Sequence, residues 1–228
     1  MTVKTARRYH APARTSQARQ TRARILVAAR ELFERRGFAA TMGEVADAAG
    51  VSVGTVELGF KTKGALLDAV VDVAIAGDDE PVSLFQRSWA TSLEDVDAQH
   101  FLSVVAGIVA EVAVDVAPLL LALDQAAPTD TRIAALNDRL TRQRMQTASW
   151  VVQGLVRRGA LADDLSADDA VQTALLLLDP IVHRRLLIQQ GWDRPRLERF
   201  LRRSFRRLLG APSREPASST LRPGPAGP

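Results

Sequence analysis

The chain of 228 residues contains no cysteine, which excludes disulfide bonds and thiolate metal sites. Its three histidines lie far apart in the sequence and do not have the spacing of metal ligands. The sequence also lacks a glycine-rich phosphate loop, a nucleophile motif and a recognisable frame of paired catalytic carboxylates. It therefore gives no support for an enzyme, and it implies no metal and no cofactor.

Acidic residues are missing from the first part of the chain, since none precedes Glu31. The first 24 residues carry one lysine and six arginines, although the whole chain has a net charge of +4. Pro12 and the polar residues after it predict that residues 1–15 form a disordered basic arm. The arm is either a solvated tail, which is the simpler interpretation, or a segment that contacts DNA phosphates or enters the minor groove. No apolar run follows this basic start, so we expect no signal peptide and a cytoplasmic protein.

Residues 41–60 have the pattern of two short helices joined by a tight turn. Thr41 and Glu44 have the spacing of a capping box, which predicts the start of the first helix. Gly50 tolerates a positive φ and is placed to end that helix, and Ser52 is placed to cap the second one. This arrangement is typical of a helix-turn-helix motif, whose second helix enters the major groove of DNA.

Two longer helices flank this motif. A stripe of apolar residues predicts a helix over residues 16–36, and Arg22 lies in its N-terminal half. Thr62 is placed to cap a further helix over residues 63–76, which has its own apolar face. We expect these helices to complete a small DNA-binding unit around the motif.

A turn interrupts the chain after these helices. Residues 77–81 contain a glycine, three acidic residues and a proline, a composition that ends a helix. We therefore predict a DNA-binding head over residues 16–78 and a body over residues 79–210. The proline- and glycine-rich residues 211–228 are predicted to form a disordered tail.

The body has helical spacing throughout, with no alternating strand pattern. We predict an all-α fold of about nine helices, with a three-helix head and a helical body. Glu111, Asp115 and Pro118 argue against a membrane span in the apolar stretch of residues 101–123. Pro180 is expected to kink one long helix, because it removes a backbone hydrogen bond. The predicted body helices cover residues 83–92, 95–115, a segment from about 118, 130–158, 167–190 and 195–209.

The last two predicted helices have more apolar surface than one chain can cover. The helix over residues 167–190 is apolar on more than one side, and the helix over residues 195–209 has an apolar stripe opposite six arginines. A second copy of the chain is the simplest cover for the remaining apolar side, so we predict a homodimer. The predicted interface consists of Val171, Leu175, Leu178, Ile181, Val182, Leu197, Leu201 and Phe205.

The order and spacing of apolar, glycine and capping residues over residues 22–67 are specific. The pattern is carried by Ile25, Leu26, Ala28, Ala29, Leu32, Phe33, Gly37, Phe38, Thr41, Val45, Ala46, Ala49, Gly50, Val51, Ser52, Gly54, Thr55, Val56, Phe60, Lys63, Leu66 and Leu67. With these residues the segment resembles the DNA-binding domain of the TetR family of bacterial repressors. The family has a helical body that binds a small-molecule effector and forms the dimer, and we expect the same of this chain.

The resemblance also implies which residues face DNA. The family's groove-facing positions, together with Arg22 of the preceding helix, fall on Arg22, Thr41, Met42, Gly43, Ser52, Val53, Gly54, Thr55, Glu57, Gly59, Lys61 and Lys63. Two of them depart from the family: Glu57 stands where a tyrosine is usual, and Gly59 where an aromatic residue or histidine is usual. Glu57 would repel phosphate, although it could accept a hydrogen bond from N4 of cytosine.

The family's effector site lies among the body helices. Its walls in this chain would include Phe101, Leu121, Gln125, Met145, Trp150 and Leu177. The hypothesis from the sequence is a ligand-responsive regulator of transcription, a repressor that binds a palindromic operator as a homodimer and is released by a small-molecule effector. Such a protein works in the bacterial cytoplasm, at the nucleoid when it is bound to DNA, and has no membrane partner. The alternative is a helical protein-interaction module with this fold and with lost or altered DNA binding, and the two departures keep it open.

Overall fold

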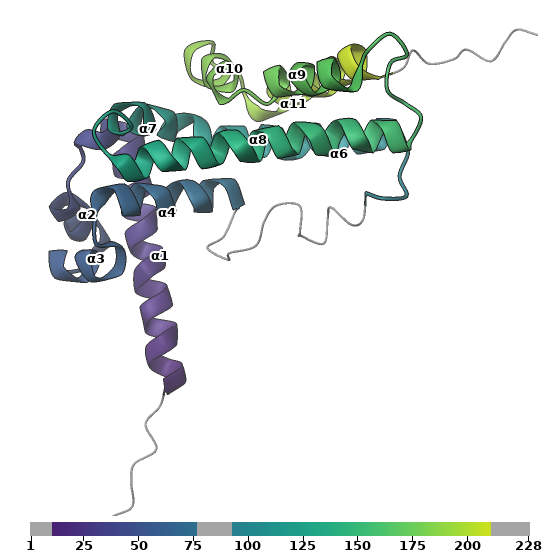
Figure 1. Ribbon diagram of the computed structural model, residues 1–228. Helices are drawn as coiled ribbons and strands as arrows, with labels where there is room; N and C mark the ends of the chain where they lie inside the picture. Colours follow the sequence, from purple (N-terminus) through teal and green to yellow (C-terminus); the bar gives the residue numbers. More distant parts are fainter. Residues whose placement is uncertain (1–10, 77–92, 211–228) are drawn as a thin grey trace, which may run out of the picture.

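The computed structural model describes residues 11–76 and 93–210, which are drawn as ribbon in Figure 1. Within these two ranges the chain is helical and contains no strand, so the predicted all-α fold is confirmed. The predicted arm up to residue 10, the helix predicted over residues 83–92 and the predicted tail lie outside the described ranges.

The helices of the head begin and end at the predicted caps, with one exception. Helix α1 begins at Ala11 and not at residue 16, so residues 11–15 of the predicted disordered arm are helical. The N-terminal half of α1 projects away from the other helices (Figure 1). The elements of the head are α1 (Ala11–Arg36), η1 (Gly37–Ala39), α2 (Met42–Ala49), α3 (Val53–Phe60) and α4 (Lys63–Ala76).

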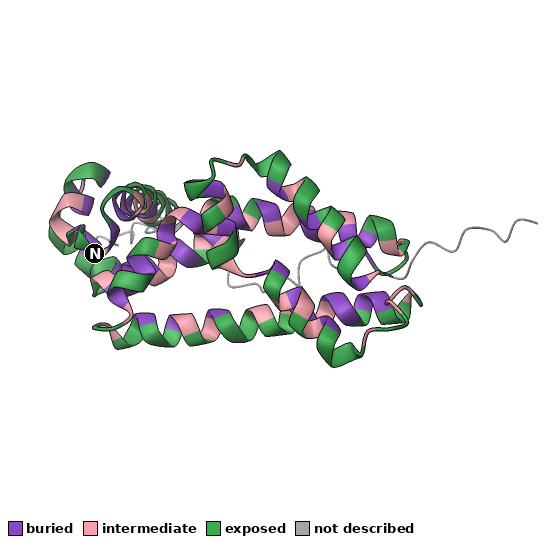
Figure 2. Cartoon of the chain, turned by 90° about the horizontal axis from the view of Figure 1, so that it is seen from above, coloured by how far each residue is buried: buried purple, intermediate pink, exposed green. Residues whose placement is uncertain are grey.

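The body is a layered set of helices in which α6 runs antiparallel to α11, and α8 packs against α9. Figure 2 shows buried residues on the facing sides of packed helices and exposed residues on their outer sides. The elements of the body are α6 (Ala98–Val116), η3 (Ala117–Leu119), α7 (Leu120–Ala126), α8 (Thr131–Arg157), α9 (Ala167–Leu177), α10 (Pro180–Arg184), the π-helical turn η4 (Arg185–Gln189) and α11 (Arg194–Leu209).

The predicted kink at Pro180 is a break between two helices. Helix α9 ends at Leu177, and Pro180 is the first residue of α10, where its missing N–H costs nothing. Asp179 caps α10 by accepting a hydrogen bond of 2.7 Å from the N–H of Ile181. The prediction of one helix over residues 167–190 was wrong, because a proline preceded by a capping residue favours a new start.

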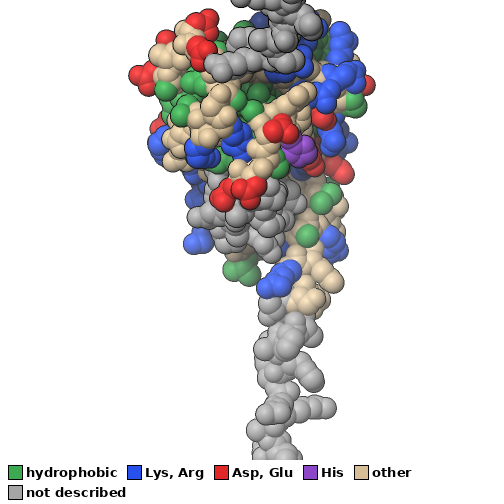
Figure 3. All heavy atoms as spheres, turned by 90° about the vertical axis from the view of Figure 1, so that its right-hand side faces the viewer, with side chains coloured by type: hydrophobic (Ala, Val, Ile, Leu, Met, Phe, Trp, Pro, Cys, Tyr) green, Lys and Arg blue, Asp and Glu red, His purple; other side chains and the backbone are tan. Residues whose placement is uncertain are grey.

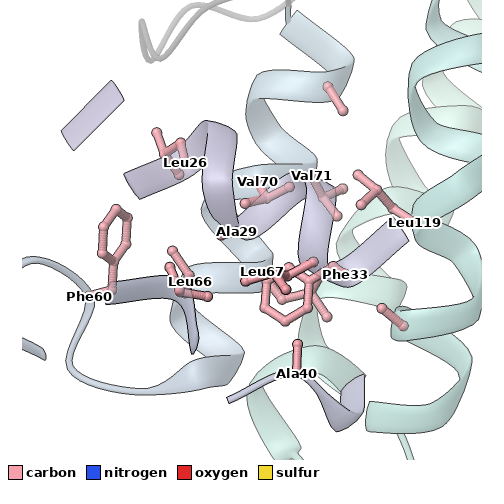
Figure 4. Packing of buried hydrophobic residues seen from close by; sticks show 14 of the residues in the cluster. Leu26, Ala29, Phe33, Ala40, Phe60, Leu66, Leu67, Val70, Val71 and Leu119 are labelled. Carbon is pink, nitrogen blue, oxygen red and sulfur yellow. The ribbon is translucent and has the colours of Figure 1, made fainter. Parts of the chain in front are cut away.

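Two clusters of buried apolar residues hold the helices together. The head cluster contains residues of α1, α2, α3 and α4 together with η3, α7 and the first half of α8. Figure 4 shows Phe33 next to Leu67, and Leu119 next to Val71, within it. The body cluster joins α6, the second half of α8, α9 and α11, with Leu187 of η4. Apolar packing therefore continues from the head into α7 and α8, beyond the predicted boundary near residue 78, which stays a prediction.

One helical stretch of the described residues, Ala98–Ala126, is long and apolar enough to cross a membrane by length and composition alone. Its buried residues contribute to both clusters. Its two central acids form ion pairs: Asp115 lies 2.7 Å from Arg30 of α1, and Glu111 lies 3.9 Å from Arg194 of α11. Packing within the chain thus covers part of the apolar surface of this stretch, and ion pairs engage its two central acids.

Candidate nucleic-acid interface and body groove

A capping box fixes the start of α2. The N–H of Thr41 donates to the Glu44 carboxylate at 2.9 Å, and the N–H of Glu44 donates to the Thr41 hydroxyl at 3.2 Å. Arg36 forms an ion pair with the same carboxylate. The hydrogen bonds that this carboxylate accepts, first from the Thr41 backbone and then from the Thr41 hydroxyl and Arg36, lower the pKa of Glu44 below its usual value. The predicted cap is confirmed, and it sets the direction in which α2 leaves η1.

The turn between α2 and α3 also has the predicted geometry. Gly50 has a φ of 64°, and the N–H of Val51 returns to the carbonyl of Ala46 at 3.0 Å. Ser52 caps α3 by accepting a hydrogen bond of 3.2 Å from the N–H of Thr55. The result is a helix-turn-helix motif in which the second helix is held rigidly at both ends of the turn.

The outer face of α3 is the part of the motif available to DNA. Val56 and Phe60 are buried against the head cluster, while Gly54, Glu57 and Gly59 are exposed. Leu58, a residue that the resemblance did not bring to attention, is 86% exposed. Its spacing could have revealed it, because a helical residue two positions from both Val56 and Phe60 points away from the buried side.

The two lysines after α3 have different environments. Lys61 is exposed and has a φ of 62°, and the N–H of Thr62 closes a tight turn around it by donating to Phe60 at 2.7 Å. Lys63 is half-buried: its Nζ donates to the carbonyl of Phe38 at 2.6 Å and lies 4.1 Å from the centroid of the Phe38 ring. Lys63 therefore links α4 to η1 through one hydrogen bond of its ammonium group, which has three N–H donors.

Arg22 connects α1 to the end of α3. Its guanidinium carbon lies 4.5 Å from the centroid of the Phe60 ring. The residues of α1 that precede Arg22 continue past α3 for about 15 Å, given the rise of an α-helix. Residues 16–20 are exposed on every side, as is Arg24. The predicted residues Thr41, Met42 and Gly43 lie at the N-terminus of α2.

The predicted wall residues of an effector pocket lie in three places. Phe101 and Trp150 are in contact, with ring centroids 5.1 Å apart, and Leu177 belongs to the same body cluster. Gln125 faces the head, where its Oε1 accepts a hydrogen bond of 2.9 Å from the N–H of Phe38. The remaining two wall residues, Leu121 and Met145, are exposed. The described residues thus bring together the first three and place the others apart.

The predicted dimer residues fall into two groups. Leu197, Leu201 and Phe205 have no exposed surface and pack inside the body cluster, so they are not available to contact a second chain. Leu178 is buried with them, while Val171 and Leu175 are half-buried. The apolar stripe of α11 was therefore assigned to the wrong contact, because α6 covers it. Ile181 and Val182 are exposed.

Other apolar residues of the last helices are exposed as well. Leu176 of α9, Ile188 of η4 and Leu208 of α11 are each more than half exposed. We call the exposed side chains of Leu176, Ile181, Val182 and Ile188, on α9, α10 and η4, the outer apolar face. Leu176 and Ile188 of this face were not predicted.

A groove of about 660 Å³ lies between α6 and α11. One side is formed by Gln99, Leu102 and Ser103 of the first turns of α6. The other side is formed by Trp192 and by residues of α11, most of them arginines. None of the predicted pocket residues lines this groove.

Comparison with known proteins agrees with this geometry. Residues 25–70 match the family model described as bacterial regulatory proteins of the tetR family. The chain is 26% identical over 198 residues to the HTH-type transcriptional regulator TtgR of Pseudomonas putida, a match that covers 78% of this chain and 85% of TtgR.

Two solved structures illustrate the likeness of the whole fold. The first is a transcriptional regulator from Saccharomonospora viridis in complex with choline, with a TM-score of 0.62, 20% identity, and coverage of 85% of this chain and 100% of that one. The second is the regulator FadR from Bacillus subtilis in complex with stearoyl-CoA, with a TM-score of 0.61, 18% identity, and coverage of 79% and 95%. With the helix-turn-helix motif in place and the family model matched around it, these comparisons support a TetR-family transcriptional regulator.

Proposed function

We propose that the protein is a homodimeric repressor that binds a palindromic operator through α2 and α3 and is released by a small-molecule effector. The observation that carries the proposal is the exposed outer face of α3, held in place by caps at Thr41, Ser52 and Thr62. A helix fixed at both ends with one face free is suited to lie in the major groove.

The chemistry of this outer face suggests how bases are read. Val53 and Leu58 are exposed apolar side chains of the kind that contact the methyl group of thymine. Glu57 accepts hydrogen bonds and fits N4 of cytosine. Helix α3 itself carries no cation, so most phosphate contacts must come from residues next to it. Lys61 at its end and the arginines of α1 are the nearest candidates.

The projecting half of α1 supports a second contact with the DNA backbone. Residues 16–20 of α1 are exposed and have no apolar stripe for packing, and residues 11–24 contain arginines and no acid. Its contact with α3 through Arg22 directs it towards the DNA that α3 would read. We therefore assign Arg19 and Arg24 to phosphates that flank each half-site.

The outer apolar face supports the homodimer. A monomer in water gains nothing from exposing the apolar side chains of Leu176, Ile181 and Ile188, whereas a second copy would bury them. Because a two-fold interface uses the same patch on both chains, one such face is enough. This placement differs from the predicted interface, since the stripe of α11 is covered within the chain.

Release by an effector requires that the body and the head move together, and polar contacts join α8 to α4, α1 to α6 and η1 to α7. Arg139 of α8 bridges Asp68 and Asp72 of α4 at 2.8 Å each. Arg30 of α1 pairs with Asp115 of α6 at 2.7 Å, and η1 is bound to α7 through Gln125. A ligand that prefers a body conformation with a different spacing of the heads would lower operator affinity by its differential affinity. Since two similar folds hold choline and stearoyl-CoA, a small-molecule effector is a reasonable expectation for this chain.

The decisive experiment is a titration of the protein against the DNA that flanks its own gene, with random duplex DNA of equal length for comparison. We expect binding of the flanking DNA to be at least about 1,000-fold tighter, as for specific regulators. Leu58→Ala should weaken the specific complex by about 1–3 kcal/mol and leave random DNA unaffected. Equal binding of both DNAs, or of neither, would favour the protein-interaction module over the repressor.

A further inference from the structure

Helix α11 is the most basic element of the described chain, and its charge has no evident use in reading DNA. Seven of its 16 residues are arginines, and Glu198 is its only acid. Its apolar stripe faces α6, so the arginines point outwards and sideways. Figure 3 looks onto the end of the body where α6 begins and α11 ends, and blue side chains gather on the right-hand side of that face.

The groove between α6 and α11 collects most of this charge. Arg196, Arg199, Arg202, Arg203 and Arg206 all line it, and no acidic residue does. Five guanidinium groups in one groove repel one another, and an anion bound among them would relieve this repulsion.

The acidic residues near α11 are engaged elsewhere. Glu111 lies 3.9 Å from Arg194, which is not part of the groove. Asp193 caps α11 by accepting a hydrogen bond of 2.8 Å from the N–H of Arg196. The carboxyl group of Glu198 faces Gly107 on α6. Among the described residues, the charge of the groove is therefore left without a carboxylate partner.

Aromatic rings lie beside the arginines. Trp192 and Phe200 meet edge to face with ring centroids 5.6 Å apart, and the guanidinium of Arg196 stacks 4.3 Å from the Trp192 ring. These contacts hold the two rings in one orientation before any ligand arrives. Leu102 adds apolar surface from α6. The groove thus offers fixed flat apolar surfaces next to forked cationic donors.

We propose that this groove binds an organic polyanion, a small molecule that carries two or more phosphate or carboxylate groups on a flat or apolar skeleton. Arginine recognises both anions through paired N–H donors, and it stacks on planar groups as well. The volume of about 660 Å³ is that of an ordinary small-molecule site. The site lies in the body and is separate from the helix-turn-helix motif, so the proposal does not depend on DNA binding.

The test uses the full-length protein and three probes in isothermal titration calorimetry at about 50 mM salt, where charge is weakly screened. ATP has both features, pyrophosphate has the charge alone, and adenosine has the ring alone. We expect ATP to bind about tenfold or more tightly than either fragment, because two kinds of contact are made at once. If ATP and pyrophosphate give no heat at millimolar concentration, the groove is not an anion site.

Two arginines one turn apart on α11 provide a matched pair of variants. Arg203 lines the groove and Arg207 does not, although both are exposed and both changes to glutamine remove one charge. Arg203→Gln should weaken ATP binding about tenfold, while Arg207→Gln should change it by less than about twofold. If both variants lose the same ATP affinity, the general charge of the helix and not a specific site explains the binding, and the proposed site is wrong.

The role of the rings is tested by Trp192→Leu, with circular dichroism to establish that the variant is folded. This variant should bring the affinity for ATP down to that for pyrophosphate. If the ratio of the ATP affinity to the pyrophosphate affinity is the same as in the wild type, the rings do not contribute to binding. Random duplex DNA serves as a competitor: if it displaces ATP from the wild type but not from Arg203→Gln, the groove is a nucleic-acid surface and the small-molecule proposal is wrong. A variant of the head that loses DNA binding should bind ATP normally, which separates this test from that of the proposed function.

Discussion

Helices α3 and α11 differ in charge, and the helix with fewer cations is the one at the expected DNA interface. Helix α3, which lies where a TetR-family regulator contacts DNA, has no lysine or arginine and carries Glu57 on its exposed face. Helix α11 carries seven arginines and lies in the body, packed against α6. Net positive charge alone would have placed the DNA interface on the wrong helix. Local geometry, which is a capped helix with one free face, locates it better.

The comparison also separates two tasks that DNA binding requires. Bases are read by shape and by hydrogen bonds at close range, and these need position more than charge. Affinity comes mainly from phosphates, and it needs cations that lie beside the reading helix. In this chain α3 would perform the first task, and α1 together with Lys61 would perform the second.

The largest expected effect comes from the buried side of α3. Phe60→Ala removes a side chain that is packed into the head cluster and stacked by Arg22, and it should cost about 3–5 kcal/mol of stability. Leu58→Ala on the exposed side should change stability by less than about 0.5 kcal/mol. Urea denaturation followed by circular dichroism measures both. If Leu58→Ala destabilises the fold as much as Phe60→Ala, the assignment of a buried side and a free side to α3 is wrong.

The next effect concerns the cations beside α3. Replacing both Arg19 and Arg24 with glutamine should lower the dependence of log K on log salt by about two units, since each lost phosphate contact removes about 0.9. The loss should be similar for specific and random DNA. Replacing Arg202 and Arg206 of α11 with glutamine removes the same charge from the body and serves as the control. Should the α11 variant lose as much slope as the α1 variant, the body would contribute to DNA binding and the comparison between the two helices would fail.

Most of the head could be predicted from the sequence, because its signals are local. Thr41, Gly50 and Ser52 act on backbone groups within four residues of themselves, so a single stretch of chain contains the information. Leu58 was missed because the resemblance emphasised its neighbours, although its spacing marked it as exposed.

The body was less predictable, because its pattern shows which face of a helix is buried but not what covers it. The stripe of Leu197 and Leu201 was assigned to a second chain, whereas α6 of the same chain covers it. Pro180 fits either a kink or a helix start, and only the cap from Asp179 decides. The groove of arginines was invisible for a similar reason, since its two sides are α6 and α11, which lie about 90 residues apart in the sequence.

A smaller effect is expected at the end of α3, where Lys61 adopts a positive φ of 62°. This backbone conformation strains a residue with a Cβ, so Lys61→Gly should stabilise the protein by about 1 kcal/mol. The same change removes a cation next to the reading helix, so DNA affinity should fall while stability rises. Lys61→Gln keeps the strain and removes the charge, and it should lower affinity without the gain in stability. Thermal unfolding and DNA titration of both variants separate strain from charge, and equal stabilities of the two variants would contradict the strain.

The smallest expected effect is a response of the body to acid that the head does not share. His183 of α10 is buried, and its Nε2 lies 2.8 Å from the carbonyl of Leu177, which the break before Pro180 leaves without its helical partner. Burial lowers the pKa of His183 below 6.5, although the hydrogen bond to Leu177 and the charge of Asp179 act in the other direction. Because the folded pKa lies below the unfolded one, the unfolded chain binds the proton more tightly in acid. Stability should therefore be constant above a pH of about 6.5 and should fall as the pH drops below it.

The measurement uses tryptophan fluorescence, because residues 1–88 contain no tryptophan and Trp150 and Trp192 lie in the body. Urea denaturation at pH 7.5 and 5.5 gives the loss of stability for the wild type and for His183→Gln, which keeps a hydrogen-bond donor for Leu177 but does not titrate. Other groups contribute equally to both proteins, so the difference between the two losses belongs to His183. We expect the wild type to lose more than the variant. A variant that loses as much as the wild type would show that His183 stays accessible to protons in the folded body, and the contrast in acid response between body and head would disappear.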